Sequence, residues 1–569
     1  MYLINRRPPL NIDLTRVRCR IISNDTSIVD AFDVVIVGGG SAGAGTARDC
    51  AKRGLKTVLV ERNDLASGAV ATCAGMISGG AKYLMEPPMV KLCSVESGII
   101  AKIARNVIFS TPILIPFLDK ADVTQGKLFV AGYSGYSELR KGDPVITLTK
   151  EETLKLEPKL SPQVMSSVYF REYFIDPFRL ILMNALDARR FGAQVLTYTE
   201  VIDVLRKGNT VYGVRVRDKF TGATREIKAK IVVNASGPWG SKIAKMAELE
   251  HPLRFNKGSH VIFDRRISDI GIIAKCLDGR TAYLFPHENT TILGTTAIDI
   301  FCDPDEVETT YDDLEYLLSA MERALPSIRE ARIIRTMTGV RPMINQYGIP
   351  EDKVTRNFEI YDFEERKGVS GFLSFGGGKL VLYRIMAEKM TDLICKKLGK
   401  TAECKTNLDP LIGAEGEVDA NLLAKQFGVY PHVVAKLAYL FGTKANDVLS
   451  LAAENPEYKA EICGCESIPE AAIRYSIRNE WARTLNDIRR RTRIAMGPCQ
   501  GCSCIHKVAA VAADELNLPA ESIMSDFRNL LQERWKGKRP LLLGKQLVQE
   551  EVLQSAYSHV TWAEKKQDQ

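Results

Sequence analysis

The sequence has 569 residues, of which 45% are hydrophobic and 26% are charged, and this length allows two to four domains around a large apolar core. Its formal net charge of +8 suits an anionic substrate or an acidic membrane surface. No nucleic-acid-binding motif accompanies this charge, so we expect no nucleic-acid partner. Thirteen cysteines in a chain of this size are too few for a disulfide scaffold.

The N-terminal segment contains no apolar run long enough for a secretory signal, and we interpret residues 1–31 as an extension before the first strand. The longest apolar stretch runs from Val107 to Leu118 and contains two prolines. It is too short to cross a bilayer, which needs about 20 residues. We therefore expect a cytoplasmic protein that is either soluble or bound peripherally to the inner face of the cell membrane.

A glycine-rich turn follows the first predicted strand. The run from Asp33 to Val37 is apolar and β-branched, as in a buried parallel strand, and the pattern predicts a helix from Ala44 to Arg53. Between them, Gly38 permits a tight turn, Gly40 lets backbone N–H groups approach a pyrophosphate, and Gly43 lets the helix pack closely on the strand. This spacing predicts a dinucleotide-binding site.

The chain beyond this turn favours a flavin over a nicotinamide cofactor. The second strand ends at Glu61, where an acidic side chain binds the adenosine ribose. A polar, glycine-rich stretch follows in place of another strand–helix unit, and two later strands, ending at Asn234 and Phe375, again lead into glycines. Predicted cofactor contacts that lie so far apart in the sequence suit an FAD-binding domain with a substrate domain inserted into it.

The cysteines are unevenly distributed, and five of the thirteen lie between Cys463 and Cys504. Such clustering in a chain without a signal peptide predicts a metal site in a reducing compartment. We expect two helices inside this segment, from Pro469 to about Asn479 and from Asn486 to Arg491. Thiolates suit iron–sulfur clusters and zinc equally well, so residue type alone leaves both metals open.

From Phe32 to its end, the chain resembles the FAD-dependent glycerol-3-phosphate dehydrogenases, in particular the anaerobic catalytic subunit with a C-terminal iron–sulfur extension. The resemblance rests on many motifs in one order, which include VVIVGGGSAGAGTARDCAKRGLKTVLVERNDLASG, NASGPW, KGSHVIF, ILGTTAID, GVRPM, VTRNFEIYD, FGGGKLVLYR and ERWKGKRPLLLGKQL. It implies an α/β fold with a glutathione-reductase-like, Rossmann-type FAD-binding domain and an interleaved antiparallel-sheet substrate domain. A helical C-terminal region would contain a small 2Fe–2S domain like bacterioferritin-associated ferredoxin.

The resemblance also implies how the chain is divided. The FAD-binding domain would be discontinuous, with the substrate domain filling the intervals. We expect the N-terminal extension at 1–31, the FAD-binding domain at 32–100, 150–250 and 335–400, the substrate-binding domain at 101–149 and 251–334, a helical connector at 401–455, the iron–sulfur domain at 456–515 and a helical tail at 516–569.

The activity implied by the resemblance is oxidation of sn-glycerol 3-phosphate to dihydroxyacetone phosphate by hydride transfer to flavin N5. Electrons would leave through a 2Fe–2S cluster to a quinone or to a membrane-bound or soluble partner protein. Two alternatives stay open: an FAD dehydrogenase of another small anionic alcohol or amine, such as a 2-hydroxy acid or amino acid, and an electron-transfer subunit without catalysis. A homodimer is also compatible with the sequence.

The resemblance further implies which residues bind FAD. Gly377 and Gly378, at the start of the last helix of the FAD-binding domain, would direct backbone N–H groups to the flavin N1–C2=O edge, where negative charge develops on reduction. The expected cofactor-binding residues are Gly38, Gly40, Ser41, Ala42, Gly43, Glu61, Arg62, Ala66, Ser67, Val201, Ser236, Gly237, Gly377, Gly378, Lys379 and Leu380.

A phosphate-ester substrate needs a cationic clamp, which arginine forks match in geometry. The substrate-binding residues implied by the resemblance are Arg341, Arg356, Lys379, Lys82 and Ser78. At Ser78 and Lys82 the family commonly has His and Arg, and serine cannot serve as a base near neutral pH. We therefore expect His260 to accept the hydroxyl proton. Lys379 would either assist by stabilising an alkoxide or serve as the base if neighbouring cations lower its pKa. The expected catalytic residues are His260, Lys379 and Arg341.

The cluster ligands implied by the resemblance are Cys463, Cys465, Cys499 and Cys502. Cys504 is the alternative to Cys502, because related domains use either spacing after Cys499. The arginines within 489–493 either offset the negative charge of the cluster or form a solvated helix face.

Overall fold

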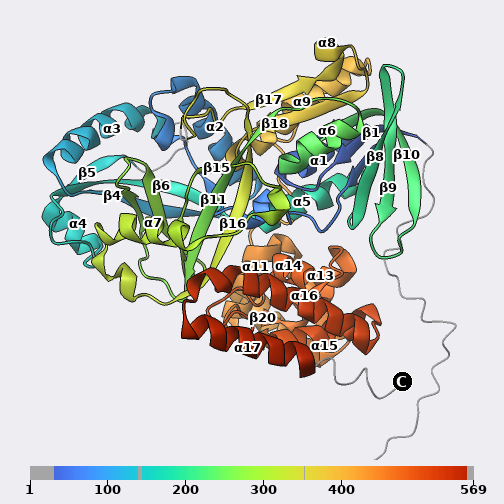
Figure 1. The fold of residues 1–569 in the computed structure, drawn as a ribbon. Coiled ribbons are helices and arrows are strands. Elements are labelled where there is room, and N and C mark those ends of the chain that lie inside the picture. Colours follow the sequence, from blue (N-terminus) through green and yellow to red (C-terminus); the bar gives the residue numbers. More distant parts are fainter. Residues whose placement is uncertain (1–30, 139–143, 352, 561–569) are drawn as a thin grey trace, which may run out of the picture.

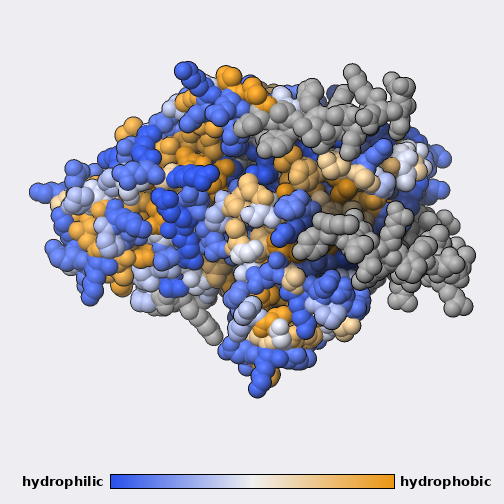
Figure 2. All heavy atoms as spheres, turned by 90° about the horizontal axis from the view of Figure 1, so that it is seen from below, coloured by the Kyte–Doolittle hydropathy of each residue, from blue (hydrophilic) through white to orange (hydrophobic). Residues whose placement is uncertain are grey.

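The computed structural model describes residues 31–138, 144–351 and 353–560, which form two sheet-containing domains and a helical C-terminal region (Figure 1). The predicted N-terminal extension lies outside the described residues except for Ala31. Within the described ranges, no helix is long and apolar enough to cross a bilayer. Seen from below, hydrophilic side chains cover much of the molecule, and hydrophobic side chains gather in patches between them (Figure 2).

Parallel strands form the centre of the first sheet, in the order β18–β10–β1–β2–β7. The antiparallel strand β17 extends it beyond β18, and the hairpin β8–β9 pairs with β10. The strands are β1 (Phe32–Val37), β2 (Thr57–Val60), β7 (Gln194–Leu196), β8 (Thr199–Lys207), β9 (Thr210–Asp218), β10 (Thr224–Asn234), β17 (Phe358–Asp362) and β18 (Phe372–Gly377). The strand predicted at Asp33 to Val37 is thus confirmed as β1, which is buried along its whole length.

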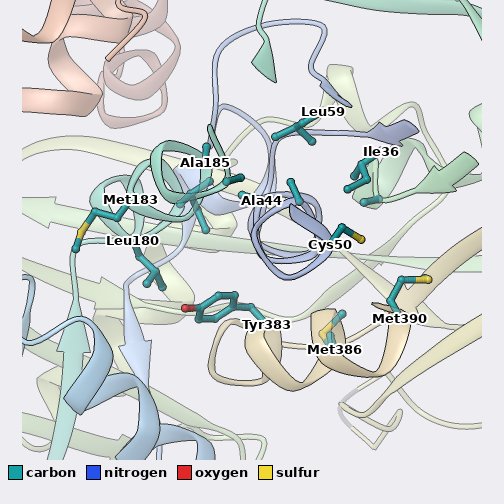
Figure 3. Packing of buried hydrophobic residues seen from close by; sticks show 14 of the residues in the cluster. Ile36, Ala44, Cys50, Leu59, Leu180, Met183, Ala185, Tyr383, Met386 and Met390 are labelled. Carbon is teal, nitrogen blue, oxygen red and sulfur yellow. The ribbon is translucent and has the colours of Figure 1, made fainter. Parts of the chain in front are cut away.

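Three helices cover one face of this sheet: α1 (Ser41–Lys52), α5 (Pro177–Arg190) and α9 (Tyr383–Lys397). The predicted helix from Ala44 to Arg53 corresponds to α1, which begins directly after Gly40. Small side chains on α1 allow close packing: a Cβ on Gly45 would lie 3.1 Å from the ring of Tyr383. The packed residues include Ile36, Ala44, Cys50, Leu59, Leu180, Met183, Ala185, Tyr383, Met386 and Met390 (Figure 3).

The second sheet is mainly antiparallel and runs in the order β15–β11–β14–β13–β12–β4–β6–β3, with β16 beside β11 and β5 beside β6. Its strands are β3 (Met76–Ile77), β4 (Ile108–Phe117), β5 (Ile146–Thr149), β6 (Ser166–Ile175), β11 (Leu253–Phe263), β12 (Gly271–Lys275), β13 (Thr281–His287), β14 (Thr290–Gly294), β15 (Ile298–Ile300) and β16 (Ile333–Ile344). The helices α2 (Pro87–Ile103), α3 (Lys120–Glu138), α4 (Lys150–Leu156) and α7 (Tyr311–Glu322) pack around it.

The second sheet contains more of the chain than the segments that the sequence predicted for the substrate domain. Strands β3, β6 and most of β16 come from segments that the sequence assigned to the FAD-binding domain. They belong to the second sheet because β6 pairs antiparallel with β4 along its whole length, and β16 pairs in the same way with β11. The longest apolar stretch of the sequence is β4, a strand within this sheet.

The C-terminal region is helical, as expected, with a short strand pair. Its elements are α10 (Ala420–Phe427), α11 (Pro431–Phe441), α12 (Ala445–Ser450), β19 (Glu461–Cys463), β20 (Ile468–Pro469), α13 (Glu470–Asn479), α14 (Leu485–Thr492), α15 (Ile505–Leu516), α16 (Ala520–Lys538) and α17 (Lys545–Val560). The two helices predicted within the cysteine segment are α13 and α14. One hydrophobic cluster extends from Ala424 to Leu530, so the predicted connector, the cysteine segment and the first part of the tail share a core.

Candidate active site

One large cavity lies between the two sheets and is bordered on one side by the C-terminal helices. Its volume is about 1760 Å³, whereas a site for one small ligand typically has about 300–1,000 Å³. Its walls come from the turn after β1, the segment after β2, strands β11 and β16, the start of α9, and helices α14 and α16. The cavity therefore has room for more than one bound molecule.

The glycine-rich turn after β1 has the conformation that its sequence predicts. Gly38 has a φ of +110°, which side chains disfavour. A Cβ on Gly43 would lie 1.8 Å from the carbonyl oxygen of Gly38, so this close packing of α1 against the turn requires glycine. A Cβ on Gly40 would meet no atom within 4 Å, and Gly40 lines the cavity at the N-terminus of α1. The helix end is thus open to an anionic group.

Glu61 is held at the cavity wall by backbone groups. Its Oε2 accepts a hydrogen bond from the Gly39 N–H at 2.6 Å, and its Oε1 accepts one from Asn63 at 2.8 Å. Burial raises the pKa of the carboxyl, and these two bonds oppose the rise. The carboxylate is therefore fixed in position at the end of β2, where the motif predicts a ribose contact.

Most of the expected cofactor-binding residues line this cavity. The residues that do so are Gly38, Gly40, Ser41, Ala42, Glu61, Arg62, Ser67, Val201, Ser236, Gly237, Gly377, Gly378, Lys379 and Leu380. Gly43 and Ala66 do not, because Gly43 packs against Gly38 and the Ala66 N–H donates to the carbonyl oxygen of Gly39. Arg62 also contacts protein groups: its guanidinium pairs with Asp305 at 2.7 Å and lies over the ring of Trp239.

The second glycine cluster forms the opposite part of the wall. Gly377 and Gly378 have φ values of +71° and +93° and precede α9. A Cβ on Gly377 would lie 2.4 Å from the carbonyl oxygen of Asn357, and one on Gly378 would lie 2.6 Å from Met386 Sδ. Only a residue without a side chain fits this turn. The glycine turns, the fixed carboxylate and the open helix end fit a dinucleotide such as FAD.

Three of the basic residues expected to bind substrate, Arg341, Arg356 and Lys379, line the same cavity. Arg341 is held in place, because its Nη1 donates to Asn256 Oδ1 at 2.6 Å and its Nη2 donates to Thr295 Oγ1 at 2.8 Å. Burial lowers the pKa of Arg341 to about 10, and the nearby charge of Arg356 contributes to this. Lys379 Nζ lies 3.4 Å from the centroid of the Tyr83 ring, and burial also lowers its pKa.

His260 on β11 lies in the wall of the cavity near these cations. Burial lowers its pKa to about 3, and the charge of Arg341 acts in the same direction. The imidazole is therefore neutral at neutral pH, and its buried Nδ1 has no hydrogen-bond partner among the described residues. A Cβ on Gly294 would lie 2.2 Å from His260 Cδ2, so Gly294 leaves the space that the ring occupies.

A buried carboxylate lies where the sequence departs from the family pattern. Glu172 accepts a hydrogen bond from the Gly79 N–H at 2.9 Å, and Ser78 Oγ lies 3.5 Å from the same carboxylate. Glu172, Ser78 and Lys82 all line the cavity. The sequence pattern did not identify Glu172, although its place on β6 between Phe170 and Phe174, which are buried on the same face, was a signal.

The cysteine segment forms two thiol pairs. Cys504 donates a hydrogen bond to Cys463, and this bond lowers the pKa of Cys463 to about 6 despite burial. Cys465 donates in the same way to Cys499. Cys502 is exposed, with its Sγ 3.9 Å from Arg534 Nη2. The structure does not bring the expected ligand Cys502 into this group, whereas the alternative, Cys504, is buried in the core with Cys463.

These pairs do not by themselves form a recognisable metal site. Among the residues that the structure describes, no group of three or more His, Cys, Asp or Glu side chains is arranged to hold a metal ion. The electrostatic influence of Cys463 nevertheless reaches both Cys465 and Cys499. The donor set of four thiols thus suits a soft metal centre in its chemistry.

Arginines near α14 attach the C-terminal region to the FAD-binding domain. Arg490 and Arg491 form ion pairs with Asp64 at 2.7 and 2.5 Å, and Asp64 is completely buried. Arg493 pairs with Asp176 at 3.0 Å, at the start of α5. A solvated helix face is therefore excluded for these three side chains. Asp64 lies three residues after Glu61, so this contact joins α14 to the loop that follows the dinucleotide motif.

Comparisons with known proteins agree with this geometry. Residues 33–393 match the family described as FAD dependent oxidoreductase, and residues 404–523 match the C-terminal domain of alpha-glycerophosphate oxidase. The chain is 34% identical over 540 residues to an anaerobic glycerol-3-phosphate dehydrogenase subunit of Escherichia coli K12, covering 94% of this chain and 98% of that protein.

Two further relatives extend the comparison. An anaerobic glycerol-3-phosphate dehydrogenase subunit of Haloferax volcanii is 33% identical over 531 residues, covering 91% of this chain and 88% of that protein. Among solved structures, the glycerol-3-phosphate dehydrogenase from Bacillus halodurans complexed with FAD superimposes with a TM-score of 0.72 at 26% identity. This superposition covers 90% of this chain and 97% of that structure.

Proposed function

This chain belongs to the family of FAD-dependent glycerol-3-phosphate dehydrogenases, and from that premise we propose that it oxidises sn-glycerol 3-phosphate to dihydroxyacetone phosphate. The observation that carries the proposal is the convergence of Arg341, Arg356 and Lys379 on the cavity that contains the dinucleotide motif. FAD, when bound, supplies the acceptor for a hydride.

The cationic side chains bind and orient the substrate. Arginine forks pair with phosphate oxygens, and partial burial strengthens such contacts because water screens them less. Arg341 is already oriented by Asn256 and Thr295, so little conformational entropy is lost when it binds an anion. The lowered pKa of Lys379 reflects its burial, and an anionic substrate would offset that cost.

His260 receives the hydroxyl proton in this proposal. Its pKa of about 3 in the protein keeps the imidazole neutral, and its unpartnered Nδ1 can accept a proton. A bound phosphate near Arg341 would cancel part of the positive charge that depresses this pKa, and so would make His260 a stronger base once substrate is present. Ser78 contributes a hydroxyl near Glu172 rather than a base.

We further propose that Cys463, Cys465, Cys499 and Cys504 hold a 2Fe–2S cluster through which electrons leave to a quinone or a partner protein. Two observations support this ligand set: the thiols form two adjacent pairs, and their charges influence one another. Short loops between helices are the usual location of such thiolates.

The anionic substrate is tested by an anaerobic titration of the oxidised holoenzyme with glycerol 3-phosphate, followed by visible and EPR spectra. We expect the flavin absorbance to bleach and a reduced-cluster signal to appear. A flavin that stays oxidised would contradict the proposal and would favour an electron-transfer subunit without catalysis.

Arg356→Met tests the phosphate clamp separately. It removes a cation of the cavity for which the structure gives no hydrogen bond to other described residues. We expect the KM for glycerol 3-phosphate to rise at least tenfold, because charge-assisted hydrogen bonds are worth about 1.5–3 kcal/mol. Arg323→Met, which removes an exposed arginine outside the cavity, is the matched control.

A second candidate is favoured by Glu172. Its carboxylate lines the cavity and accepts hydrogen bonds from Gly79, Ser78 and Tyr133, and an ammonium group, which glycerol 3-phosphate lacks, would add a further donor there. The chain would then oxidise a small amine or amino acid. Turnover of glycerol 3-phosphate compared with lactate and proline distinguishes these cases: the main proposal predicts that only the phosphate ester is a good substrate.

A further inference from the structure

Two arginines in the wall of the cavity lack the partners that their neighbours have. Arg489 on α14 is only 9% exposed, yet its one contact with the described residues is a hydrogen bond from Nη1 to Asn486 Oδ1 at 3.1 Å. Arg335 on β16 pairs through its backbone with β11, but its side chain forms no ion pair or hydrogen bond within the described ranges. The Nε of each is buried without a hydrogen-bond partner.

Arg335 lies against the end of α16, where a Cβ on Gly537 would be 3.5 Å from its Nε, and α14, which carries Arg489, packs against the same helix. Burial lowers the pKa of Arg489 to about 9, and the charge of Arg335 is the next cause. Burial likewise lowers the pKa of Arg335. Glu533 on α16 opposes both shifts but forms no ion pair with either arginine. Charge without a partner is unfavourable at such sites, so this arrangement calls for an anion.

The neighbouring arginines provide the contrast. Arg490, Arg491 and Arg493 all form ion pairs of 3.0 Å or less with buried aspartates of the FAD-binding domain. Arg489 takes no part in these ion pairs, so the attachment of α14 to the FAD-binding domain does not explain why a charged side chain lies at this position. Arg489 also lines the cavity.

The surroundings of the two arginines are polar and fixed. Asn529, Gln532, Glu533 and Lys536 follow the spacing of one face of α16, and all line the cavity. Thr336, next to Arg335, donates a hydrogen bond to the carbonyl oxygen of Gly537 at 2.9 Å and so anchors the end of α16 to β16. These amide and ammonium groups can supply further hydrogen bonds to a ligand.

This end of the cavity is separate from the expected substrate site. Arg335 and Arg341 lie on the same strand, six residues apart, which corresponds to about 20 Å along the strand. No small phosphate ester reaches from one to the other.

We propose that Arg335 and Arg489 form a second anion site, at the C-terminal end of the cavity, that binds the phosphate group of a ligand other than the flavin and other than the substrate molecule held by Arg341. Both guanidinium groups line the cavity and have a buried Nε without a partner, so they would supply the donors that phosphate oxygens accept. The phosphate is that of inorganic phosphate or of a small phosphate ester. This inference does not depend on which alcohol or amine the enzyme oxidises.

The test uses the oxidised holoenzyme and inorganic phosphate as the probe. Calorimetric titration is compared between wild type, the double variant Arg335→Met/Arg489→Met and the control Arg332→Met, an exposed arginine near the same strand. We expect the double variant to lose one bound phosphate or to bind it at least tenfold more weakly, while the control is unchanged. Equal binding in all three proteins would overturn the proposal.

Flavin content and thermal stability separate loss of the anion site from loss of the fold or of the cofactor. Methionine should not destabilise the protein, because it replaces a buried charge without a partner. Added phosphate should raise the Tm of wild type and not that of the double variant. Loss of FAD from the double variant would instead assign the arginines to the dinucleotide and refute a separate site. If the double variant does not fold, Arg489→Lys keeps the charge but not the fork, and unchanged phosphate affinity there would also refute it.

The identity of the ligand is addressed in the Arg341→Met holoenzyme, where the expected substrate site is weakened. Displacement of bound phosphate by glycerol 3-phosphate in this variant assigns the site to small phosphate esters. Failure of glycerol 3-phosphate to displace it assigns the site to inorganic phosphate. Absence of phosphate binding to this variant, when it retains its flavin, would overturn the proposal, because Arg335 and Arg489 are intact.

Discussion

The FAD-binding half of the cavity and the cysteine-bearing C-terminal region reach their geometry by different routes. In the first, Gly38 and Gly43 contact each other within one turn and the start of one helix. In the second, Cys463 meets Cys504 only after the intervening helices have packed together. The difference shows that a site made by neighbours in the chain follows from spacing, whereas a site made by distant residues depends on packing.

The largest effect on stability and FAD binding should come from a substitution in the glycine-rich turn after β1. Gly43→Ala would place a Cβ 1.8 Å from the Gly38 carbonyl oxygen, and we expect destabilisation of about 3 kcal/mol or more together with loss of FAD. Flavin absorbance of the purified protein and chemical denaturation measure both effects.

Gly40→Ala is the matched control for that change, because its Cβ would meet no protein atom within 4 Å. This variant should keep the Tm of wild type and bind FAD more weakly, since the methyl group points into the cavity. Equal destabilisation of the two variants would show that the turn is not packed as described.

Cys502 and Cys504, at the end of the cysteine segment, test the second half of the comparison. We expect Cys504→Ser to lower iron content and the EPR signal strongly, because Cys504 is buried beside Cys463. Cys502→Ser should leave both unchanged, since Cys502 is exposed. The reverse result would restore Cys502 as the ligand, and loss of iron in neither variant would argue against the cluster.

The contact between the two regions should show an intermediate effect. Asp64→Asn leaves the buried Arg490 and Arg491 without their charged partner. We expect a loss of about 3 kcal/mol, the lower end for a broken buried pair, because the amide oxygen still accepts a hydrogen bond, and weaker FAD binding. Asp305→Asn breaks the partly exposed pair with Arg62 and should cost less than about 1 kcal/mol. Urea denaturation followed by flavin fluorescence compares the two, and similar losses would show that burial does not decide the difference.

At neutral pH the smallest effect should come from His260, because its contribution to stability changes only below pH 6.5. The pKa of His260 is about 3 in the folded protein and about 6.5 ordinarily, so between these values the unfolded chain binds a proton that the folded protein does not. The contribution of His260 is present above pH 6.5 and is lost as the pH falls toward 3. His260→Asn should flatten the pH dependence of unfolding across this window, and an unchanged slope would contradict the burial of a neutral imidazole.

Several features of the site could be predicted from sequence because they are local or carried by a family motif. The strand, turn and helix around Gly38, Gly40 and Gly43 follow from spacing and backbone sterics. Arg341, Arg356 and Lys379 carry no such local signal, and only the resemblance indicated them. Glu172 was missed because a single charged residue in a strand does not reveal which cavity it faces.

By itself, the sequence determined the first parallel strands, the dinucleotide turn and the helical character of the C-terminal region, since backbone preferences and hydrophobic periodicity act over a few residues. Only the tertiary structure decided which sheet β6 and β16 join, which of Cys502 and Cys504 faces the core, and which arginines find a carboxylate. Those outcomes depend on contacts between segments far apart in the chain, whose pairing is set by the packing of whole elements rather than by any local pattern.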